Sequence, residues 1–199
     1  MLSINSTCPI VINVAPLLDG MSDDDFLEFC HLNRELRIER TKEGNIIIMP
    51  PTSSETGNRN FNLTVSFGIW ARQDGTGKGF DSSTGFQLPN GAKRSPDLAW
   101  VRNERWEALS AEERKRFAPL CPDFVVELRS TYDSLAALEE KMKEYIANGA
   151  QLGWLIDPAE RKIYIYRPNA EVEALDDPQS VSGEPLLKGF VLNTRELFV

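Results

Sequence analysis

A short apolar segment near the middle of the chain contains one acidic residue, and this feature constrains the fold most strongly. Residues 124–128 read Phe-Val-Val-Glu-Leu, so Glu127 lies inside a pattern typical of a buried strand. A carboxylate is costly to bury unless it has a cationic partner, a metal ion or a proton. Glu127 therefore indicates a metal site, with a structural ion pair to Arg or Lys as the alternative.

Strand and helix patterns alternate along the rest of the chain. Strands are expected at residues 36–40, 45–49, 79–88, 95–101, 124–128, 152–157, 161–166 and 186–192. Helices are expected near residues 22–32, 55–73 and 134–148, and a short polar helix is expected around Ser110 within residues 104–117. In the helix at 55–73 we expect Phe61, Val65 and Ile69 to face inward, with Leu63 and Trp70 as further candidates. Together these patterns predict an α/β fold, with a mixed α+β sheet flanked by helices.

Length and composition favour one soluble domain that spans residues 1–199, with residues 1–21 as an N-terminal extension and residues 168–184 as an acidic loop. No apolar run approaches the length of a membrane span, and the N-terminal residues do not resemble a signal peptide. The three cysteines are odd in number and widely spaced, which is typical of reduced thiols in a cytoplasmic protein.

The charge distribution gives an ambiguous indication about partners. A net charge of −8 disfavours nucleic acid, but residues 59–116 contain ten Lys and Arg against seven Asp and Glu. A locally basic surface is therefore compatible with the sequence. The single histidine, His31, lies in a helical pattern and is expected to be a partly buried helix residue rather than part of a catalytic triad.

Asp97 is the natural companion of Glu127. Asp97 opens the strand before the one that contains Glu127, so the two carboxylates meet at one end of the sheet if the strands are antiparallel neighbours. Two such carboxylates repel unless a cation binds them or one takes a proton. Oxygen ligands without His or Cys indicate Mg²⁺ or Mn²⁺. Strand alternation also predicts that Arg129 faces the same side as Glu127.

Two further charged residues are candidates for the same site. Glu55 begins the helix at 55–73, where it either reaches the carboxylates or completes a capping box with Thr52. Lys141 lies about 40° outside the apolar stripe of the helix at 134–148, beside Tyr145. A lysine at such a margin commonly extends to water, but two converging carboxylates make it a candidate catalytic cation.

Four motifs together resemble the Uma-type putative restriction endonucleases of the PD-(D/E)XK nuclease superfamily. They are Ser-Pro-Asp at 95–97, the segment at 122–130, a lysine, tyrosine and glycine at 141, 145 and 149, and Trp-Leu-Ile-Asp-Pro at 154–158. The resemblance runs from about Phe26 to the C-terminus. It implies a restriction-endonuclease-like core in which Asp97 and Glu127 hold Mg²⁺ and Glu55 completes the metal shell.

The chain departs from the superfamily pattern at Arg129, which stands where the E-x-K motif has lysine. The resemblance implies that Lys141 on the following helix takes the place of that lysine, and that Arg129 contacts phosphate. It also implies a homodimer.

The resulting expectation is a cytoplasmic, Mg²⁺-dependent endonuclease that hydrolyses DNA. The alternative is a catalytically silent nuclease-like fold that binds nucleic acid or a protein. An unrelated α+β scaffold with a structural Glu127 is a third reading.

Overall fold

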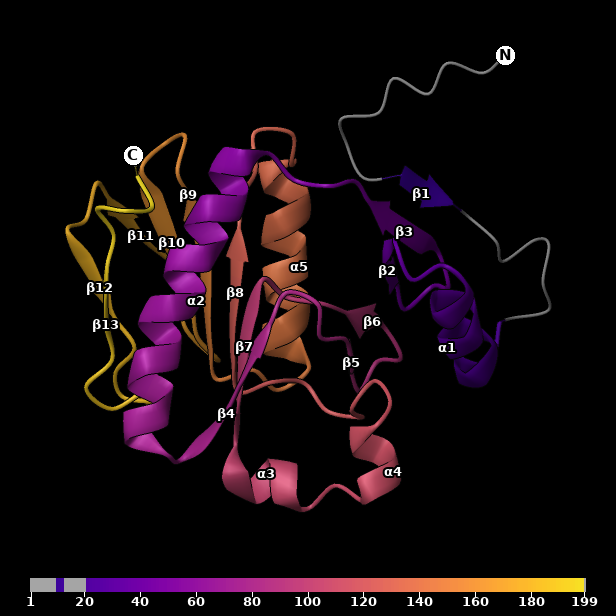
Figure 1. Cartoon of the computed structure of the whole chain (residues 1–199). Coiled ribbons are helices and arrows are strands. Elements are labelled where there is room, and N and C mark those ends of the chain that lie inside the picture. The colour runs from indigo at the N-terminus through magenta and orange to yellow at the C-terminus, as the bar shows by residue number, and fades with distance from the viewer. Residues whose placement is uncertain (1–9, 13–20, 199) are drawn as a thin grey trace, which may run out of the picture.

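The computed structural model describes residues 10–12 and 21–198. Its central sheet has the strand order β11-β10-β9-β8-β7-β4 (Figure 1). These strands are β11 Glu173–Asp176, β10 Lys162–Tyr166, β9 Leu152–Asp157, β8 Phe124–Leu128, β7 Leu98–Arg102 and β4 Gly77–Asp81. Strand β8 pairs parallel with β9 and antiparallel with β7, so the sheet is mixed. All residues of β8 are buried, as its apolar sequence predicts.

Two long helices cover opposite faces of this sheet. Helix α2, Ser54–Asp74, buries Leu63 and Phe67 in one core cluster, together with Phe124 and Trp154. Helix α5, Leu135–Ala147, buries Met142 and Tyr145 in a second cluster, together with Val125 and Leu155. The two clusters take alternate residues of β8, which confirms the predicted alternation of its side chains.

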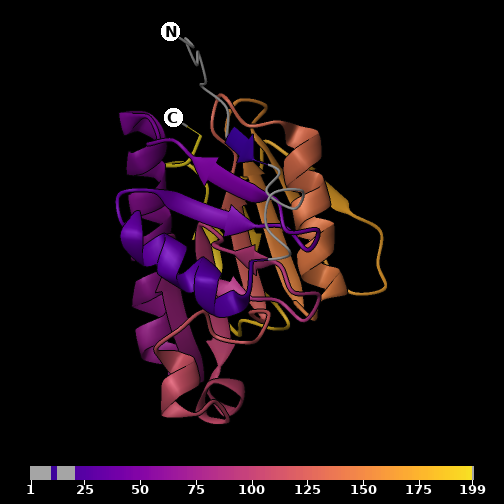
Figure 2. The same cartoon turned by 90° about the vertical axis from the view of Figure 1, so that its right-hand side faces the viewer.

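A second, smaller sheet lies across the front of the molecule, with α2 on one side and α5 on the other (Figure 2). Its strand order is β1-β3-β2-β6-β5, for β1 Ile10–Ile12, β3 Ile46–Met49, β2 Arg37–Arg40, β6 Lys93–Arg94 and β5 Phe86–Gln87. The hairpin of β2 and β3 confirms the prediction for residues 36–49. Helix α1, Asp23–Leu32, packs Phe26 against Ile38 and Ile46 of this sheet.

The short elements complete the fold and correct three expectations. They are α3 Asn103–Glu107, α4 Ala111–Arg114, β12 Ser180–Ser182 and β13 Val191–Asn193. The segment 168–184, expected as a loop, contains β11 and β12. The segment 79–88, expected as one strand, divides into β4 and β5, which belong to different sheets. The last strand is β13, which is shorter than the expected 186–192.

The inward face of α2 was predicted wrongly. Phe61, Val65 and Ile69 are 64%, 42% and 57% exposed. The helix has two apolar stripes, and the one that contains Leu63 and Phe67 packs on the sheet because its aromatic rings meet Phe124 and Phe190. The expectations for Leu63 and the partly buried Trp70 are confirmed. No helix within residues 21–198 is both long and apolar enough to cross a membrane.

A candidate active site at the junction of the two sheets

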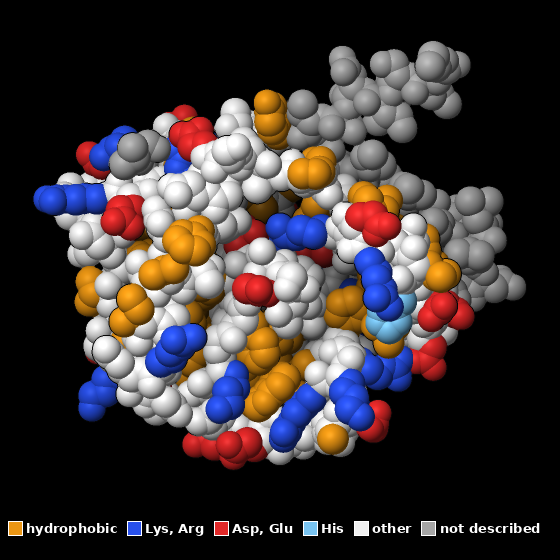
Figure 3. All heavy atoms as spheres, in the orientation of Figure 1, with side chains coloured by type: hydrophobic (Ala, Val, Ile, Leu, Met, Phe, Trp, Pro, Cys, Tyr) orange, Lys and Arg blue, Asp and Glu red, His pale blue; other side chains and the backbone are white. Residues whose placement is uncertain are grey.

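A cleft of about 980 Å³ lies where the hairpin of β2 and β3, the beginning of α2, the loop after β8 and helix α5 meet. In Figure 3, basic and acidic side chains are visible together in the hollow at the upper centre of this face. Asp97, Glu127 and Lys141 all line this cleft. The cleft is therefore where the sequence-predicted residues can meet a ligand.

Asp97 and Glu127 are brought together by the pairing of their strands. The antiparallel register places Leu98 opposite Val126, so Asp97 lies opposite Glu127. The backbone N–H of Leu128 donates a hydrogen bond of 2.9 Å to Asp97 Oδ2, which holds the aspartate at the end of β8. The convergence predicted from antiparallel neighbours is found.

Lys141 extends from α5 and lies between two glutamates, Glu127 and Glu39. Its Nζ lies 2.9 Å from Glu127 Oε1 and donates a hydrogen bond of 2.8 Å to Glu39 Oε1. One turn further along the helix, the hydroxyl of Tyr145 donates to Glu127 Oε1 at 3.0 Å. The lysine therefore points into the cleft instead of extending to water.

Glu39 is a site residue that sequence reasoning missed. It lies on β2, is 2% exposed, and accepts hydrogen bonds from the backbone N–H of Ser95 at 2.9 Å and from Arg94 Nη1 at 3.1 Å. The signal was present, since Glu39 follows the apolar Ile38 in a predicted strand. It was hidden because Arg37 and Arg40 make the strand look like a solvated hairpin.

Burial and neighbouring charges perturb the pKa of each acidic group. Burial raises the pKa of Glu127 to about 7 against the attraction of Lys141, and the carboxylates of Asp97 and Glu39 add to the rise. Burial also raises the pKa of Asp97, although Arg37 opposes it. For Glu39 the outcome is reversed: Lys141 and Arg94 outweigh burial and lower the pKa.

Lys141, which lies between Glu127 and Glu39, stays protonated. Burial alone would lower the pKa of Lys141, but Glu127 and Glu39 more than offset this effect and raise it. The pKa of Tyr145 is raised well above its ordinary value, first by burial and then by the carboxylates of Glu127 and Glu39. Lys141 and Tyr145 are therefore a charged and a neutral hydrogen-bond donor at ordinary pH.

Two arginines border the acidic residues. Arg94 donates from Nε to Glu144 Oε2 at 2.6 Å, which links β6 to α5 beside Glu39. Arg37 Nη2 lies 3.6 Å from Asp97 Oδ1, and its side chain is 39% exposed within the cleft. Arg37 is therefore the arginine placed to meet a ligand near Asp97.

Arg129 does not reach the cleft, where a phosphate contact was expected. Its Nη1 donates to the buried Asp157 at 2.6 Å, and its Nε donates to the backbone oxygen of Asp133 at 3.2 Å. The parallel register of β8 and β9 sets Arg129 beside Asp157, so the guanidinium meets that carboxylate instead of the cleft. Its guanidinium stabilises the loop and does not line the cleft.

Glu55 is also placed away from the acidic residues. Its side chain is 65% exposed and pairs with Arg59 at 2.6 Å. The predicted capping box is displaced as well, because Ser53 is the N-cap residue and accepts from the N–H of Thr56. Thr56 and Asn60 of α2 face the cleft where Glu55 was expected.

The donor set fits a hard divalent cation bound through few protein ligands. Asp97 and Glu127 present carboxylate oxygens to the cleft, and Mg²⁺ is commonly held by one or two carboxylates with several waters. Within residues 10–12 and 21–198, no group of three or more His, Cys, Asp or Glu side chains is arranged to hold a metal ion. A site here would therefore rest on two carboxylates and water.

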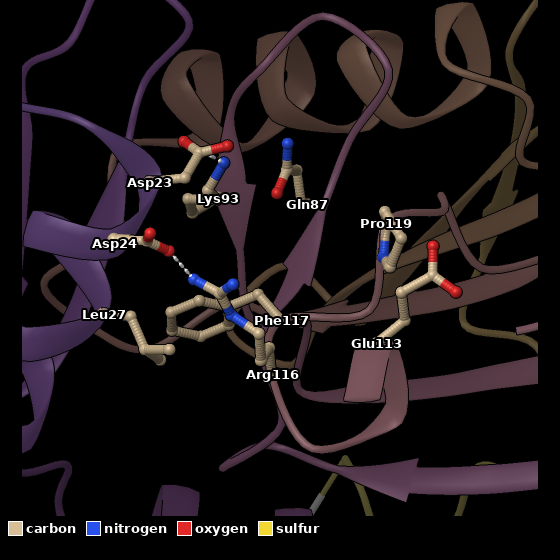
Figure 4. A pocket seen from close by; sticks show the side chains of 9 residues that line it. All are labelled: Asp23, Asp24, Leu27, Gln87, Lys93, Glu113, Arg116, Phe117 and Pro119. Carbon is tan, nitrogen blue, oxygen red and sulfur yellow. Dashed lines mark hydrogen bonds and ion pairs between the residues drawn. The ribbon is translucent and has the colours of Figure 1, made fainter. Parts of the chain in front are cut away.

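A second, smaller cavity of about 160 Å³ lies between α1 and the loop that follows α4 (Figure 4). Four of its charged residues form two ion pairs: Lys93 Nζ lies 2.7 Å from Asp23 Oδ1, and Arg116 pairs with Asp24. Arg40, outside the cavity, also pairs with Asp23. Lys93 is 1% exposed, and burial lowers its pKa despite Asp23. These pairs attach α1 to the rest of the fold, so the cavity is structural.

Comparisons with known proteins agree with this architecture. A family model described as putative restriction endonuclease matches residues 23–195. The fold is similar to the crystal structure of a putative nuclease from Anabaena variabilis ATCC 29413, with a TM-score of 0.72 and 22% sequence identity over 90% of this chain and 98% of that one. A search of curated proteins found no match. The predicted mixed sheet flanked by helices is confirmed.

Proposed function

The chain belongs to the putative restriction endonuclease family, and from that premise we propose that it is a metal-dependent endonuclease that hydrolyses DNA phosphodiester bonds. The observation that carries the proposal is the convergence of Asp97, Glu127 and Lys141 in one open cleft. Two carboxylates and one cation in a cleft match the needs of phosphodiester hydrolysis, in which negative charge develops on the phosphate.

Asp97 and Glu127 are the proposed ligands of Mg²⁺ or Mn²⁺. A divalent ion bound there would polarise the scissile phosphate and lower the pKa of the attacking water. The raised pKa of Glu127 accords with this role, because burial and the nearby carboxylates of Asp97 and Glu39 disfavour its negative charge, and Lys141 shares its ammonium group between Glu127 and Glu39. A bound cation would relieve this repulsion. Glu55 is too exposed and too firmly paired with Arg59 to complete this set.

Lys141 is the proposed catalytic cation. Glu39 and Glu127 hold its ammonium group charged and fix its position from two sides. A cation preorganised in this way stabilises the negative charge of the transition state or orients the attacking water. Arg37, rather than Arg129, is the proposed phosphate contact, because it lines the cleft beside Asp97.

A nicking assay tests the proposal. Supercoiled plasmid incubated with the wild-type protein and Mg²⁺ or Mn²⁺ is expected to be nicked, and the Glu127→Ala variant is expected to be inactive. Thermal unfolding of both proteins shows whether the variant still folds. If folded wild-type protein neither nicks DNA nor binds metal, the catalytic proposal is wrong.

A catalytically silent fold that binds nucleic acid or protein is the second candidate. The observation that favours it is that Lys141 already pairs with both Glu39 and Glu127, so part of the site's charge is balanced without a metal ion. Calorimetric titration with Mg²⁺ separates the two candidates. An active enzyme is expected to bind Mg²⁺ and to lose binding on Asp97→Ala, whereas a silent fold shows no binding to lose.

We further propose a homodimer built on the outer face of α2. Phe61, Val65 and Ile69 form an exposed stripe, and residues 60–71 contain no charged side chain. Figure 3 shows hydrophobic side chains at the surface over α2. A neutral apolar stripe complements itself across a twofold axis, and the small residues Thr64 and Gly68 allow close approach.

We also propose a single domain over residues 1–199 and a cytoplasmic location. The location is supported by Cys30 and Cys121, which are both free thiols.

A further inference from the structure

We propose that the cleft receives nucleic acid as an unpaired strand, with one base stacked on Tyr132. This inference rests on the proposed nuclease function and names the substrate class of the same site. It is carried by the position of Tyr132, by the apolar surface beside it and by the charge of the cleft.

Tyr132 is an exposed aromatic residue at the mouth of the cleft. Its side chain is 53% exposed, and it lines the same cleft as Asp97 and Glu127. Three hydrogen bonds hold the loop that carries Tyr132. The N–H of Ser130 donates to Asp133 Oδ2 at 2.9 Å, the N–H of Asp133 donates to the backbone oxygen of Ser130 at 3.2 Å, and Arg129 Nε donates to the backbone oxygen of Asp133 at 3.2 Å. Tyr132 is therefore an aromatic platform on a braced turn.

Apolar surface continues from Tyr132 along both sides of the cleft. Ala137 and Leu138 contribute it on the α5 side, and Ile47, Met49 and Pro50 contribute it on the hairpin side. Nucleobases have apolar faces that stack on aromatic and aliphatic side chains. Such surface suits a base whose faces are uncovered, and the bases inside a duplex cover one another.

The charge of the cleft also favours a single strand over a duplex. Five basic and seven acidic side chains line it, so the cleft is not a basic channel. Binding to a duplex depends largely on neutralising its phosphates with Lys and Arg, and a net charge of −8 provides little of that attraction. A single strand also carries phosphates, but its bases can stack on an aromatic ring, which adds about 1–3 kcal/mol per base that a closed duplex does not gain.

Asp97 and Glu127 lie deep in the cleft, and their depth is a geometric reason to expect a single strand. Lys141 joins Glu39 of β2 to α5, and Arg94 joins β6 to Glu144 of α5, so the small sheet and α5 meet beside the acids. The side chains of Asp97 and Glu127 are 12% and 5% exposed at that junction. A flexible single strand can bring a phosphate down to them, whereas a stiff duplex resists the necessary bending.

The experiment measures binding without cleavage. Fluorescence anisotropy in EDTA compares a labelled single-stranded oligonucleotide with a duplex of the same sequence at fixed low salt. The wild-type protein is expected to bind the single strand at least about ten-fold more tightly than the duplex. Tyr132→Ala is expected to weaken single-strand binding by about ten-fold, and Tyr132→Phe to retain it within about two-fold, because the ring does the stacking.

Thr131→Ala is the matched control, because Thr131 is an exposed neighbour on the same loop that lines the cleft without an aromatic ring. It is expected to bind like the wild type. The inference is overturned if the duplex binds as tightly as the single strand, or if Tyr132→Ala binds the single strand normally. Tyrosine-dependent binding without cleavage of the single-stranded oligonucleotide in Mg²⁺ or Mn²⁺ would instead contradict only the proposed catalysis.

Discussion

Glu39 and Glu127 share one cation, although they belong to different sheets. Lys141 Nζ lies 2.8 Å from Glu39 Oε1 and 2.9 Å from Glu127 Oε1. Glu39 lies on β2 of the small sheet, Glu127 lies on β8 of the central sheet, and Lys141 lies on α5. The contact that places the proposed catalytic cation therefore also joins the two sheets through α5.

Replacing Lys141 tests both consequences of this arrangement. Lys141→Met is expected to lower plasmid nicking at least about 100-fold, because the transition state loses a preorganised cation. It is also expected to lower the free energy of unfolding by about 3 kcal/mol, because two buried carboxylates lose their shared partner. Lys143→Met, two residues away and exposed, is the control and is expected to leave both quantities near wild type. Normal nicking by Lys141→Met would remove this lysine from the mechanism.

Local patterns in the sequence were sufficient for part of this site. The apolar residues around Glu127 identified a buried strand, and the position of Asp97 at the start of the preceding strand predicted their meeting. The helical stripe of α5 placed Lys141 beside Tyr145. Each of these inferences needed only alternation, periodicity and one assumption about the pairing of neighbouring strands.

Other parts depend on contacts between segments far apart in the chain. Glu39 is 102 residues from Lys141, and nothing in its own strand indicates that a lysine of α5 will cover it. The two apolar stripes of α2 are similar in sequence, and only the aromatic residues of the sheet select the one that contains Phe67. Glu55 was misplaced because the capping motif put the N-cap at Thr52, whereas Ser53 is the cap and Glu55 turns outward to pair with Arg59.

Asp23 is expected to be important for the attachment of α1. Asp23→Asn leaves the buried Lys93 without its counter-charge and is expected to lower the free energy of unfolding by about 2 kcal/mol, less than for a fully buried pair because Asp23 is 46% exposed. Chemical denaturation at neutral pH measures the loss. Asp24→Asn, which removes the more exposed pair with Arg116, is expected to have a smaller effect.

The effect of Asp23→Asn on stability is expected to depend on pH. Burial alone would raise the pKa of Asp23, but Lys93 and Arg40 outweigh it and hold the pKa below its ordinary value of 3.8. A lowered pKa in the folded state stabilises the protein above about pH 4, and this contribution is lost as the pH falls through the folded-state pKa. The difference in stability between wild type and Asp23→Asn is therefore expected to shrink toward pH 3. A difference that grows on acidification would contradict the assignment.

Tyr145 is expected to position Glu127. Tyr145→Phe removes the hydroxyl that donates to Glu127 Oε1 at 3.0 Å within a buried environment. The free energy of unfolding is expected to fall by about 2 kcal/mol, which is typical of a hydrogen bond to a charged group. Because Glu127 remains present, Mg²⁺ binding measured by calorimetry is expected to weaken without being lost. A stability equal to that of the wild type would show that the Tyr145 hydroxyl contributes little.

The outer stripe of α2 gives a prediction about assembly. Val65→Glu places a carboxylate at the middle of the stripe formed by Phe61, Val65 and Ile69, where a twofold interface would bury it beside its own copy. Light scattering after size-exclusion chromatography is expected to show a wild-type dimer and a folded Val65→Glu monomer. Leu32→Glu changes an apolar residue of α1 that is 73% exposed and is expected to leave the dimer intact. A wild-type monomer at the highest soluble concentration, or a dimer that survives Val65→Glu, would show that this face of α2 does not form the interface.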